Sequence, residues 1–420
     1  MSARTPSHRA RPLTSLAAAI AAVAALGAAP AAHAQARVLF DAAHAQTAGN
    51  ADWVLDEDTC GIAQRYPTPT QSSITSTTGE TYWRGAFSAF GVDVVKRGFS
   101  VESLPTGTAI TYGNTSNPQD LSNYRVFIIP EPNVRFTTAE KTAIQAFVQN
   151  GGGLFMISDH YNSDRNNDGW DSPEIFNDLG APTLFGISFN TGSVTPNYFD
   201  NNPDDNYTVD TSSPIVFTGP YGTASLKRGL GLFGATAFTI NPSANASVQG
   251  HIWHTSGTPG ATTQVTFATA TYGAGRVAAL GDSSPGEDNT NGCSHTTYTG
   301  WNDTRFDNAL LQLNAIAWLA GVTGGVAAPN APTGLAAATG ASAGQVNLTW
   351  TDNSSAETRY VLERRPTSST TWRVVGILAA NTISYTDTGL TSGTSYTYRL
   401  AAINTGGSSA FTATASATAR

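Results

Sequence analysis

The chain has 420 residues, which is too long for one ordinary hydrophobic core, so at least two domains are expected. Its formal net charge of −8 at pH 7 disfavours nucleic acids and anionic lipids as partners, because both select basic surfaces. Only 12% of the residues are charged, and glycine is abundant with 41 residues, which suits a secreted protein with many turns.

The first 34 residues have the pattern of a secretory signal peptide. Three arginines among the first 11 residues precede the apolar stretch 16–29, which is too short to cross a bilayer. Residues 32–34, Ala-His-Ala, match a cleavage site. We therefore expect a mature chain that begins at Gln35, spans no membrane, and is exported to the periplasm or the extracellular medium.

The two cysteines, Cys60 and Cys293, both lie in polar segments. Neither lies in the Gly-x-Cys-x-Gly pattern of a catalytic elbow. Because export permits disulfide formation, we predict a Cys60–Cys293 bridge, with two free thiols as the alternative.

From residue 37 onward, short apolar runs alternate with amphipathic segments. This pattern predicts an α/β fold with a doubly wound, mostly parallel sheet and helices on both faces. The predicted strands are 37–40, 92–95, 125–129, 154–157 and 276–280. The predicted helices are 80–90, 137–149, which begins with a capping box, and 306–322.

Polar residues follow several of these strands directly, where ligands bind in open α/β sheets. In chain order they are Asp41, His44, Glu131, Asp159, His160 and Asp282. We predict that a catalytic group is formed by His44, Glu131, Asp159 and His160. We also predict that a divalent ion, calcium or zinc, is held by Asp41, His44, Asp159 and Asp282, where it would lower the pKa of a bound water. A metal-free acid/base pair is the alternative.

Residues 164–169, Asp-Arg-Asn-Asn-Asp-Gly, match the first half of a calcium-binding loop. Its first ligands would be Asp164, Asn166 and Asp168. The match ends there, because Ile175 stands where such a loop needs glutamate. An Asx-rich turn without a metal ion is the alternative prediction.

The order of elements over residues 36–322 resembles the class I glutamine-amidotransferase-like superfamily. The matching segments are 38–44, 124–130, the Gly-Gly-Gly-Leu-Phe run at 151–155, 175–179 with 185–187, and 275–282 before the last helix. The resemblance implies one α/β domain over residues 35–322. True amidotransferases have a nucleophilic cysteine where this chain has Ser158-Asp159-His160, so glutaminase activity is not carried over.

After a linker rich in Gly, Ala and Pro at 323–330, residues 331–420 resemble a fibronectin type III domain. Trp350 lies in the alternating run 346–350, and Leu390 followed by Tyr396 is similar to the tyrosine corner of such sandwiches. The resemblance implies an all-β sandwich that serves a secreted enzyme as a spacer or adhesive module.

Three functions fit these features. The first is a secreted hydrolase of an extracellular polymer, with a carbohydrate as the expected substrate. The second is a non-catalytic protein that binds carbohydrate or another protein, with sugar rings stacking on aromatic side chains. The candidates for stacking are Trp53, Trp170, Tyr198 and Trp301. The third, a secreted nuclease or phosphoesterase, ranks last because the chain is acidic.

Overall fold

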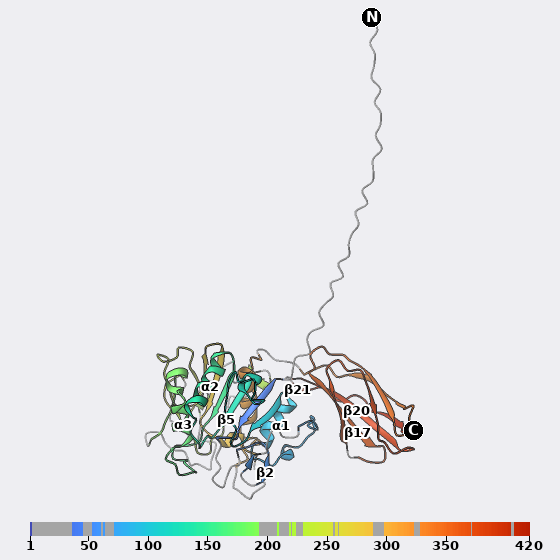
Figure 1. Cartoon of the computed structure of the whole chain (residues 1–420), viewed down its shortest axis with the longest axis horizontal. Helices are drawn as coiled ribbons and strands as arrows, with labels where there is room; N and C mark the ends of the chain where they lie inside the picture. Colours follow the sequence, from blue (N-terminus) through green and yellow to red (C-terminus); the bar gives the residue numbers. More distant parts are fainter. Residues whose placement is uncertain are drawn as a thin grey trace. The chain divides into compact units, whose positions relative to one another are not determined.

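The structure is a computed structural model. Besides Met1 it describes residues 36–44, 53–59, 62–63, 71–192, 208–209, 218–219, 221–223, 230–254, 257–258, 260–288, 298–322, 328–370, 372–404 and 407–420 (Figure 1). The predicted signal peptide, Tyr198, and Cys60 and Cys293 with their predicted disulfide lie outside these residues. In the part of the chain that is described, no helix has the length and apolar character needed to cross a membrane.

A ten-stranded mixed sheet forms the frame of the first folded part. One half is parallel, with the strand order β4-β1-β5-β6-β14. These strands are β1 (Arg37–Asp41), β4 (Ser100–Leu104), β5 (Val126–Pro130), β6 (Gly153–Ile157) and β14 (Gly275–Leu280). β5 and β6 are buried along their whole length, as expected for strands covered on both faces.

The other half of the sheet is antiparallel, beginning where β13 pairs with β14. Its strands are β13 (Val265–Tyr272), β11 (Phe238–Ile240), β7 (Ile187–Phe189), β12 (Gln249–Trp253) and β8 (Thr208–Val209). The prediction of a mostly parallel, doubly wound sheet therefore fits only the first half. The sheet as a whole is mixed, because the chain after β6 returns through hairpin-like antiparallel strands rather than through helical crossovers.

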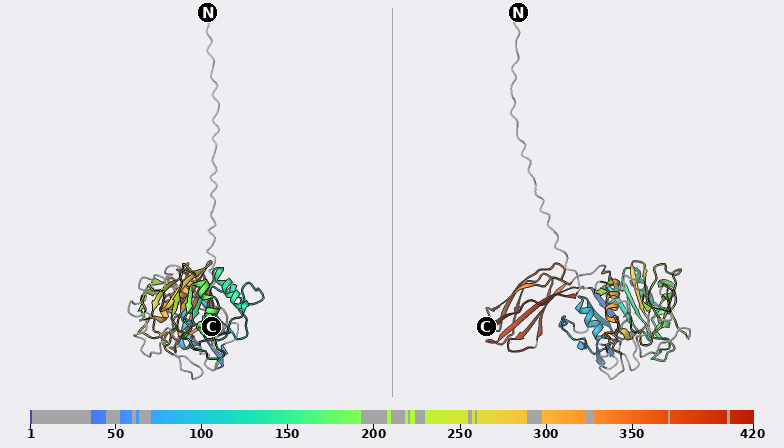
Figure 2. Two further views of the ribbon diagram at one scale, coloured as in Figure 1. Left: turned by 90° about the vertical axis from the view of Figure 1, so that its left-hand side faces the viewer. Right: turned by 180° about the vertical axis from the view of Figure 1, so that it is seen from behind.

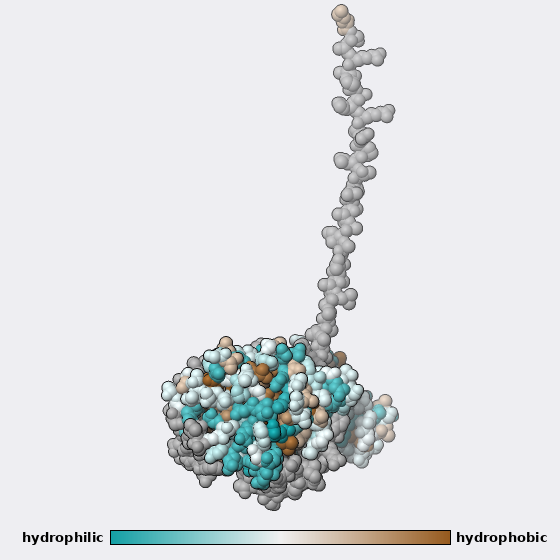
Figure 3. Space-filling model, turned by 60° about the vertical axis from the view of Figure 1, so that its left-hand side comes forward, coloured by the Kyte–Doolittle hydropathy of each residue, from teal (hydrophilic) through white to brown (hydrophobic). Residues whose placement is uncertain are grey.

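Helices cover both faces of the parallel strands (Figures 1 and 2). One apolar core contains α1 (Ser88–Lys96) and α5 (Asn308–Leu319). The core on the opposite face contains α2 (Thr138–Gln149) and α3 (Ser172–Asp178). Strand residues alternate between the two cores, so that Val38 and Phe40 join the first and Leu39 joins the second. The face that Figure 3 shows carries a central band of hydrophilic residues and scattered hydrophobic spots on a surface of mostly intermediate hydropathy.

The predicted helix at 80–90 and strand at 92–95 are wrong. Residues 92–95 belong to α1, and the strand that follows it is β4. β-Branched valines favour strands locally, but here Val92, Val94 and Val95 are helical and buried. The carboxylate of Asp288 accepts the N–H of Ala89 at the start of α1, a contact from a distant segment that no local pattern reveals.

Short elements complete this part of the chain. They are the strand pairs β2 (Glu57–Thr59) with β3 (Ile62–Ala63) and β9 (Thr218–Gly219) with β10 (Gly222–Thr223), and the short helices η1 (Glu80–Tyr82), η2 (Leu121–Asn123), η3 (Ala181–Phe185) and η5 (Ser284–Gly286). η5 directly follows Asp282 and Ser283, which lie at the end of β14.

Residues from 333 onward form a sandwich of two antiparallel sheets. The first contains β15 (Thr333–Thr339), β16 (Val346–Thr351) and β19 (Ser384–Asp387), and the second contains β17 (Arg359–Pro366), β18 (Arg373–Ala379), β20 (Ser395–Asn404), β21 (Gly407–Ser408) and β22 (Ala415–Thr418). Trp350 is buried between them, with its ring 6.0 Å from that of Tyr360. The hydroxyl of Tyr396 accepts the N–H of Thr391 at 3.3 Å, which is the contact expected of a tyrosine corner.

Candidate functional site

The carboxyl ends of three neighbouring parallel strands bring predicted site residues to one edge of the sheet. Pro130 of β5 and Leu280 of β14 both pair with Ile157 of β6. Glu131, Asp159 and Asp282 follow these partners within two residues, so their positions along the edge are matched. The strand ends predicted from the sequence therefore do meet at this edge.

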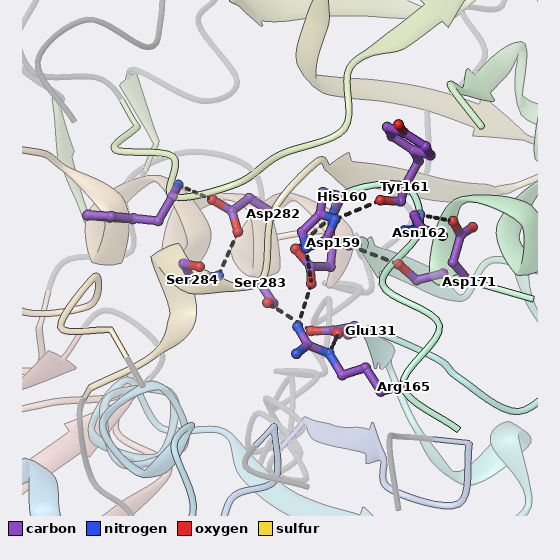
Figure 4. A network of polar contacts seen from close by, with 12 residues as sticks. Glu131, Asp159, His160, Tyr161, Asn162, Arg165, Asp171, Asp282, Ser283 and Ser284 are labelled. Atoms are coloured by element: carbon purple, nitrogen blue, oxygen red, sulfur yellow. Dashed lines mark hydrogen bonds and ion pairs between the residues drawn. The ribbon is translucent and has the colours of Figure 1, made fainter. Parts of the chain in front are cut away.

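Arg165 joins two of these carboxylates (Figure 4). Its Nε donates to Glu131 Oε1 at 2.8 Å, and its Nη2 donates to Asp159 Oδ2 at 2.7 Å. The hydroxyl of Ser283 donates to the other oxygen of Glu131 at 3.0 Å. Both carboxylates are buried, whereas the Arg165 side chain is 31% exposed.

The backbone of Glu131 is strained. Its φ of 39° lies in the left-handed region, which glutamate rarely adopts. The Glu131 N–H donates to the Ile157 carbonyl at 2.7 Å, and both carboxylate oxygens are bonded. These contacts together hold a conformation that costs on the order of 1 kcal/mol. Backbone strain of this kind is concentrated at functional sites, which supports a functional role for this edge of the sheet.

Two carboxyl groups of this cluster have a raised pKa. Burial, followed by the negative charge of Asp159, raises the pKa of Glu131 well above its ordinary value, and Arg165 opposes this shift. The same two causes raise the pKa of the fully buried Asp282, although two backbone N–H groups donate to its carboxylate. Carboxyl groups that keep a proton toward neutral pH are typical of acid/base sites.

His160 presents an imidazole beside these carboxylates. Its Nδ1 lies 2.7 Å from the Tyr161 carbonyl oxygen, so Nδ1 carries a proton and donates it there. Its Nε2 lies 3.8 Å from Asp159 Oδ2, and the side chain is 18% exposed. An oriented, partly exposed imidazole next to a carboxylate can exchange a proton with a bound molecule.

Asp41 and His44 lie in a second cluster. His44 Nδ1 is 3.0 Å from Asp41 Oδ2, and His44 Nε2 is 3.5 Å from Glu140 Oε2. Burial opposes protonation of His44, but the charges and hydrogen bonds of the two carboxylates outweigh it and raise the His44 pKa to about 10. Since Glu140 also completes the capping box of α2 with Thr137, the imidazolium ties the end of β1 to the start of α2. These contacts favour a structural role for His44 over the predicted catalytic one.

The predicted metal ligands divide between the two clusters. Asp41 and His44 contact each other, whereas Asp159 and Asp282 belong to the network around Arg165. Among the described residues, no group of three or more His, Cys, Asp or Glu side chains is arranged to hold a metal ion.

The loop that resembles a calcium site has the hydrogen bonds of an Asx-rich turn. Both carboxylate oxygens of Asp164 accept backbone N–H groups, from Asp168 at 3.1 Å and from Gly169 at 2.8 Å. Asp168 accepts the N–H of Trp170 at 2.9 Å, and Asn166 Nδ2 donates to the Asn133 carbonyl at 2.6 Å. The side chains proposed as ligands thus stabilise the turn itself.

Most of the aromatic residues proposed for sugar stacking are engaged within the protein. Trp301 is buried and stacks on Phe90 with ring centroids 4.6 Å apart. Trp53 is also buried, and the Arg165 guanidinium lies 4.7 Å from its ring. The ring of Trp170 is covered by a guanidinium as well, that of Arg135, at 3.7 Å. Trp53, Trp170 and Trp301 therefore contribute to packing.

The sequence patterns did not identify Arg165 as a site residue. It lies inside the loop interpreted as a calcium site, where the acidic neighbours dominated the pattern. The available signal was a lone cation in an acidic loop, five positions after His160. Ser283 was likewise not identified, because its contact with Glu131 depends on the pairing of β6 with both β5 and β14.

Comparison with known proteins concerns the C-terminal part of the chain. Residues 330–418 match the family model of the fibronectin type III domain. A fibronectin-III-like protein from Clostridium thermocellum is 30% identical, over 22% of this chain and 96% of its own, with a TM-score of 0.20. A structure of titin domains is 31% identical, over 22% of this chain and 32% of its own, with a TM-score of 0.20. No curated protein matches significantly. The resemblance of residues 36–322 to glutamine-amidotransferase-like proteins stays a prediction.

Proposed function

Because residues 330–418 belong to the fibronectin type III family, which indicates an extracellular or binding role, we propose that this chain is a secreted hydrolase of an extracellular polysaccharide. The observation that carries the proposal is the cluster of Glu131, Asp159, His160 and Arg165, in which buried carboxylates lie behind a partly exposed imidazole and guanidinium. Hydrolysis of a glycosidic bond requires proton transfer at the reacting oxygen, which such a cluster supplies.

In this proposal His160 is the residue that exchanges a proton with the substrate. Protonated His160 donates from Nε2 to the glycosidic oxygen as the carbon–oxygen bond breaks, and water adds to the anomeric carbon. The neutral imidazole left by this transfer accepts the proton that the water loses, so the imidazolium is regenerated. Asp159 stabilises the imidazolium, and Arg165 balances the charge of Asp159.

A second candidate function is non-catalytic binding of a glycan or protein. Full burial of Glu131 and Asp282 favours it, because paired and buried carboxyl groups can serve the fold alone. A fibronectin type III domain is also a frequent binding module. A nuclease or phosphoesterase has no comparable support, since the chain is acidic and the Arg165 guanidinium is already bonded to two carboxylates.

The test measures reducing ends released from cellulose, xylan, mannan and chitin. We expect His160→Gln and Asp159→Asn to lower the rate at least about 100-fold, as for removal of an acid/base group. Asp178→Asn is the matched control, because it removes a surface carboxylate that pairs with Lys141 at 3.1 Å. Activity that survives both site variants would contradict the assignment, and binding without cleavage by the wild-type chain would favour the second candidate.

The predicted divalent ion is tested in the same assay. A metal-dependent site would lose activity after treatment with EDTA and regain it on addition of calcium or zinc. The acid/base mechanism proposed here uses side chains alone, so we expect EDTA to leave the rate unchanged. If EDTA abolishes the activity and calcium or zinc restores it, the site depends on a metal ion.

A further inference from the structure

A pair of aromatic rings, one of them exposed, lies beside the acidic cluster. The rings of Tyr298 and Phe233 are stacked, with centroids 5.0 Å apart and an interplanar angle of 27°. Tyr298 is 38% exposed, in contrast to the buried Trp53 and Trp301. An aromatic ring that is supported on one side and open to solvent is a binding surface for a flat apolar partner.

The backbone of each aromatic residue is bonded to an acidic side chain near the site. The Phe233 N–H donates to Asp282 Oδ2 at 2.5 Å, and the Tyr298 N–H donates to Glu287 Oε2 at 2.7 Å. Burial, and then the charges of Asp282, Glu287 and Asp159, raise the pKa of Tyr298, so its hydroxyl stays neutral. Asp282, which accepts the Phe233 N–H, directly precedes Ser283, and the Ser283 hydroxyl donates to Glu131 at 3.0 Å, so the aromatic pair is joined to the cluster through this segment.

We propose that Tyr298, supported by Phe233, is the platform on which a neutral pyranose ring of the substrate stacks beside the catalytic cluster. This inference rests on the proposed function, which it deepens by naming the class of glycan. The C–H groups on one face of a pyranose ring pack well against an aromatic ring. Sugars that carry a carboxylate should bind more weakly, because the Glu287 carboxylate that accepts the Tyr298 N–H would repel them.

The experiment measures binding of the full-length chain to cellohexaose, xylohexaose, mannohexaose, chitohexaose and polygalacturonate by calorimetry. At least one neutral oligosaccharide is expected to bind, and Tyr298→Ala should raise its Kd about tenfold. Tyr298→Phe keeps the ring and should bind as the wild type does. Ile383→Ala, which truncates a 58% exposed apolar residue of the fibronectin type III domain, is the control and should change nothing. Thermal melting checks that every variant is folded.

The inference is overturned if Tyr298→Ala binds normally, if polygalacturonate binds more tightly than the neutral sugars, or if no neutral sugar binds. Its failure is distinguishable from failure of the proposed hydrolase. If a neutral oligosaccharide binds through Tyr298 but is not cleaved, the stacking role of Tyr298 is supported and the hydrolase proposal is rejected. If cleavage depends on Asp159 but Tyr298→Ala has an unchanged KM, the hydrolase proposal is supported and the stacking role of Tyr298 is rejected.

Discussion

Burial acts on His44 and Glu131 in the same way, by disfavouring the charged form, yet the two residues end in opposite states. Asp41 and Glu140 outweigh the burial of His44 and hold it as an imidazolium. At Glu131 the charge of Asp159 adds to burial, and Arg165 only partly offsets it, so the neutral acid is favoured. Neighbouring charges therefore decide which titratable residue serves the fold and which is suited to proton transfer.

Replacement of His44 tests its structural role. The folded-state pKa of about 10 exceeds the ordinary 6.5, so the stabilisation is complete below pH 6.5 and is lost as pH rises through 10. His44→Gln should lower the free energy of unfolding by about 3 kcal/mol at pH 6, and the difference from wild type should shrink toward pH 10. Urea denaturation at pH 6, 8 and 10 measures this.

The control for this prediction is His251→Gln, which removes a buried histidine whose Nε2 lies 2.7 Å from the Thr269 hydroxyl. Because this Nε2 bonds to a neutral hydroxyl group, we expect a smaller change without the same decline toward pH 10. If the His44→Gln variant is folded but no longer hydrolyses polysaccharide, the result supports the catalytic role that the sequence predicted for His44.

Glu131→Gln should change stability in the opposite direction. A carboxyl group whose pKa is raised by folding costs stability as pH rises above its ordinary value of 4.5, because ionisation is harder in the folded state. Glutamine keeps the contacts to Arg165 and Ser283 without the charge. The variant should therefore be more stable than wild type by on the order of 1 kcal/mol at pH 8, and the gain should vanish near pH 4. Equal melting temperatures at both pH values would show that Glu131 carries no such penalty.

The sequence was sufficient to place acidic residues at strand ends, because an apolar run followed by a carboxylate is a local pattern. It did not predict that Asp41 and Asp159 would belong to different networks. That division depends on Glu140 of α2 approaching His44 and on Arg165 returning from its loop to Asp159. The first contact joins residues that are far apart in the chain, and the second forms within a loop that has no regular hydrophobic pattern. Residue spacing therefore predicts neither contact.

At the level of secondary-structure elements, the strands of the parallel half were predicted best, since β1, β5, β6 and β14 are short apolar runs. The error at α1 and β4 arose because a valine-rich segment fits a helix or a strand equally well. A contact from a distant segment, the Asp288 carboxylate at the start of α1, favours the helix here. Apart from β13, the strands of the antiparallel half have five residues or fewer, so their pairing could not be inferred from periodicity.

Gly275 shows how closely α2 approaches the sheet. A Cβ atom at this position would lie 1.9 Å from the Val148 carbonyl oxygen of α2, so Gly275→Ala must displace backbone. We expect it to lower the free energy of unfolding by about 3 kcal/mol. Gly79→Ala is the control, because a Cβ there meets nothing within 4 Å and its φ of −67° suits alanine. Similar melting temperatures for the two variants would contradict this packing.

At the level of the whole molecule, the C-terminal sandwich has its own hydrophobic core, which includes Trp350, Tyr360 and Tyr398. Its charged residues also pair internally, with Arg364 bonded to Asp387 at 2.7 Å and Arg399 to Glu363 at 2.6 Å. The sequence predicted this domain well because alternation, turns and the tyrosine corner are all local features. The proposed boundary at residue 331 follows from the same pattern.

We therefore predict that residues 331–420 fold alone. A separate core should give a cooperative transition, since each domain of this size buries enough apolar surface to be stable. Full-length protein should then show two thermal transitions, one of which coincides with that of the fragment in calorimetry. Trp350→Ala should shift that transition alone, by about 3 kcal/mol of unfolding free energy, because it empties the centre of the sandwich. A disordered fragment, or a Trp350→Ala variant in which both transitions move together, would show that the two parts of the chain are stable only as one unit.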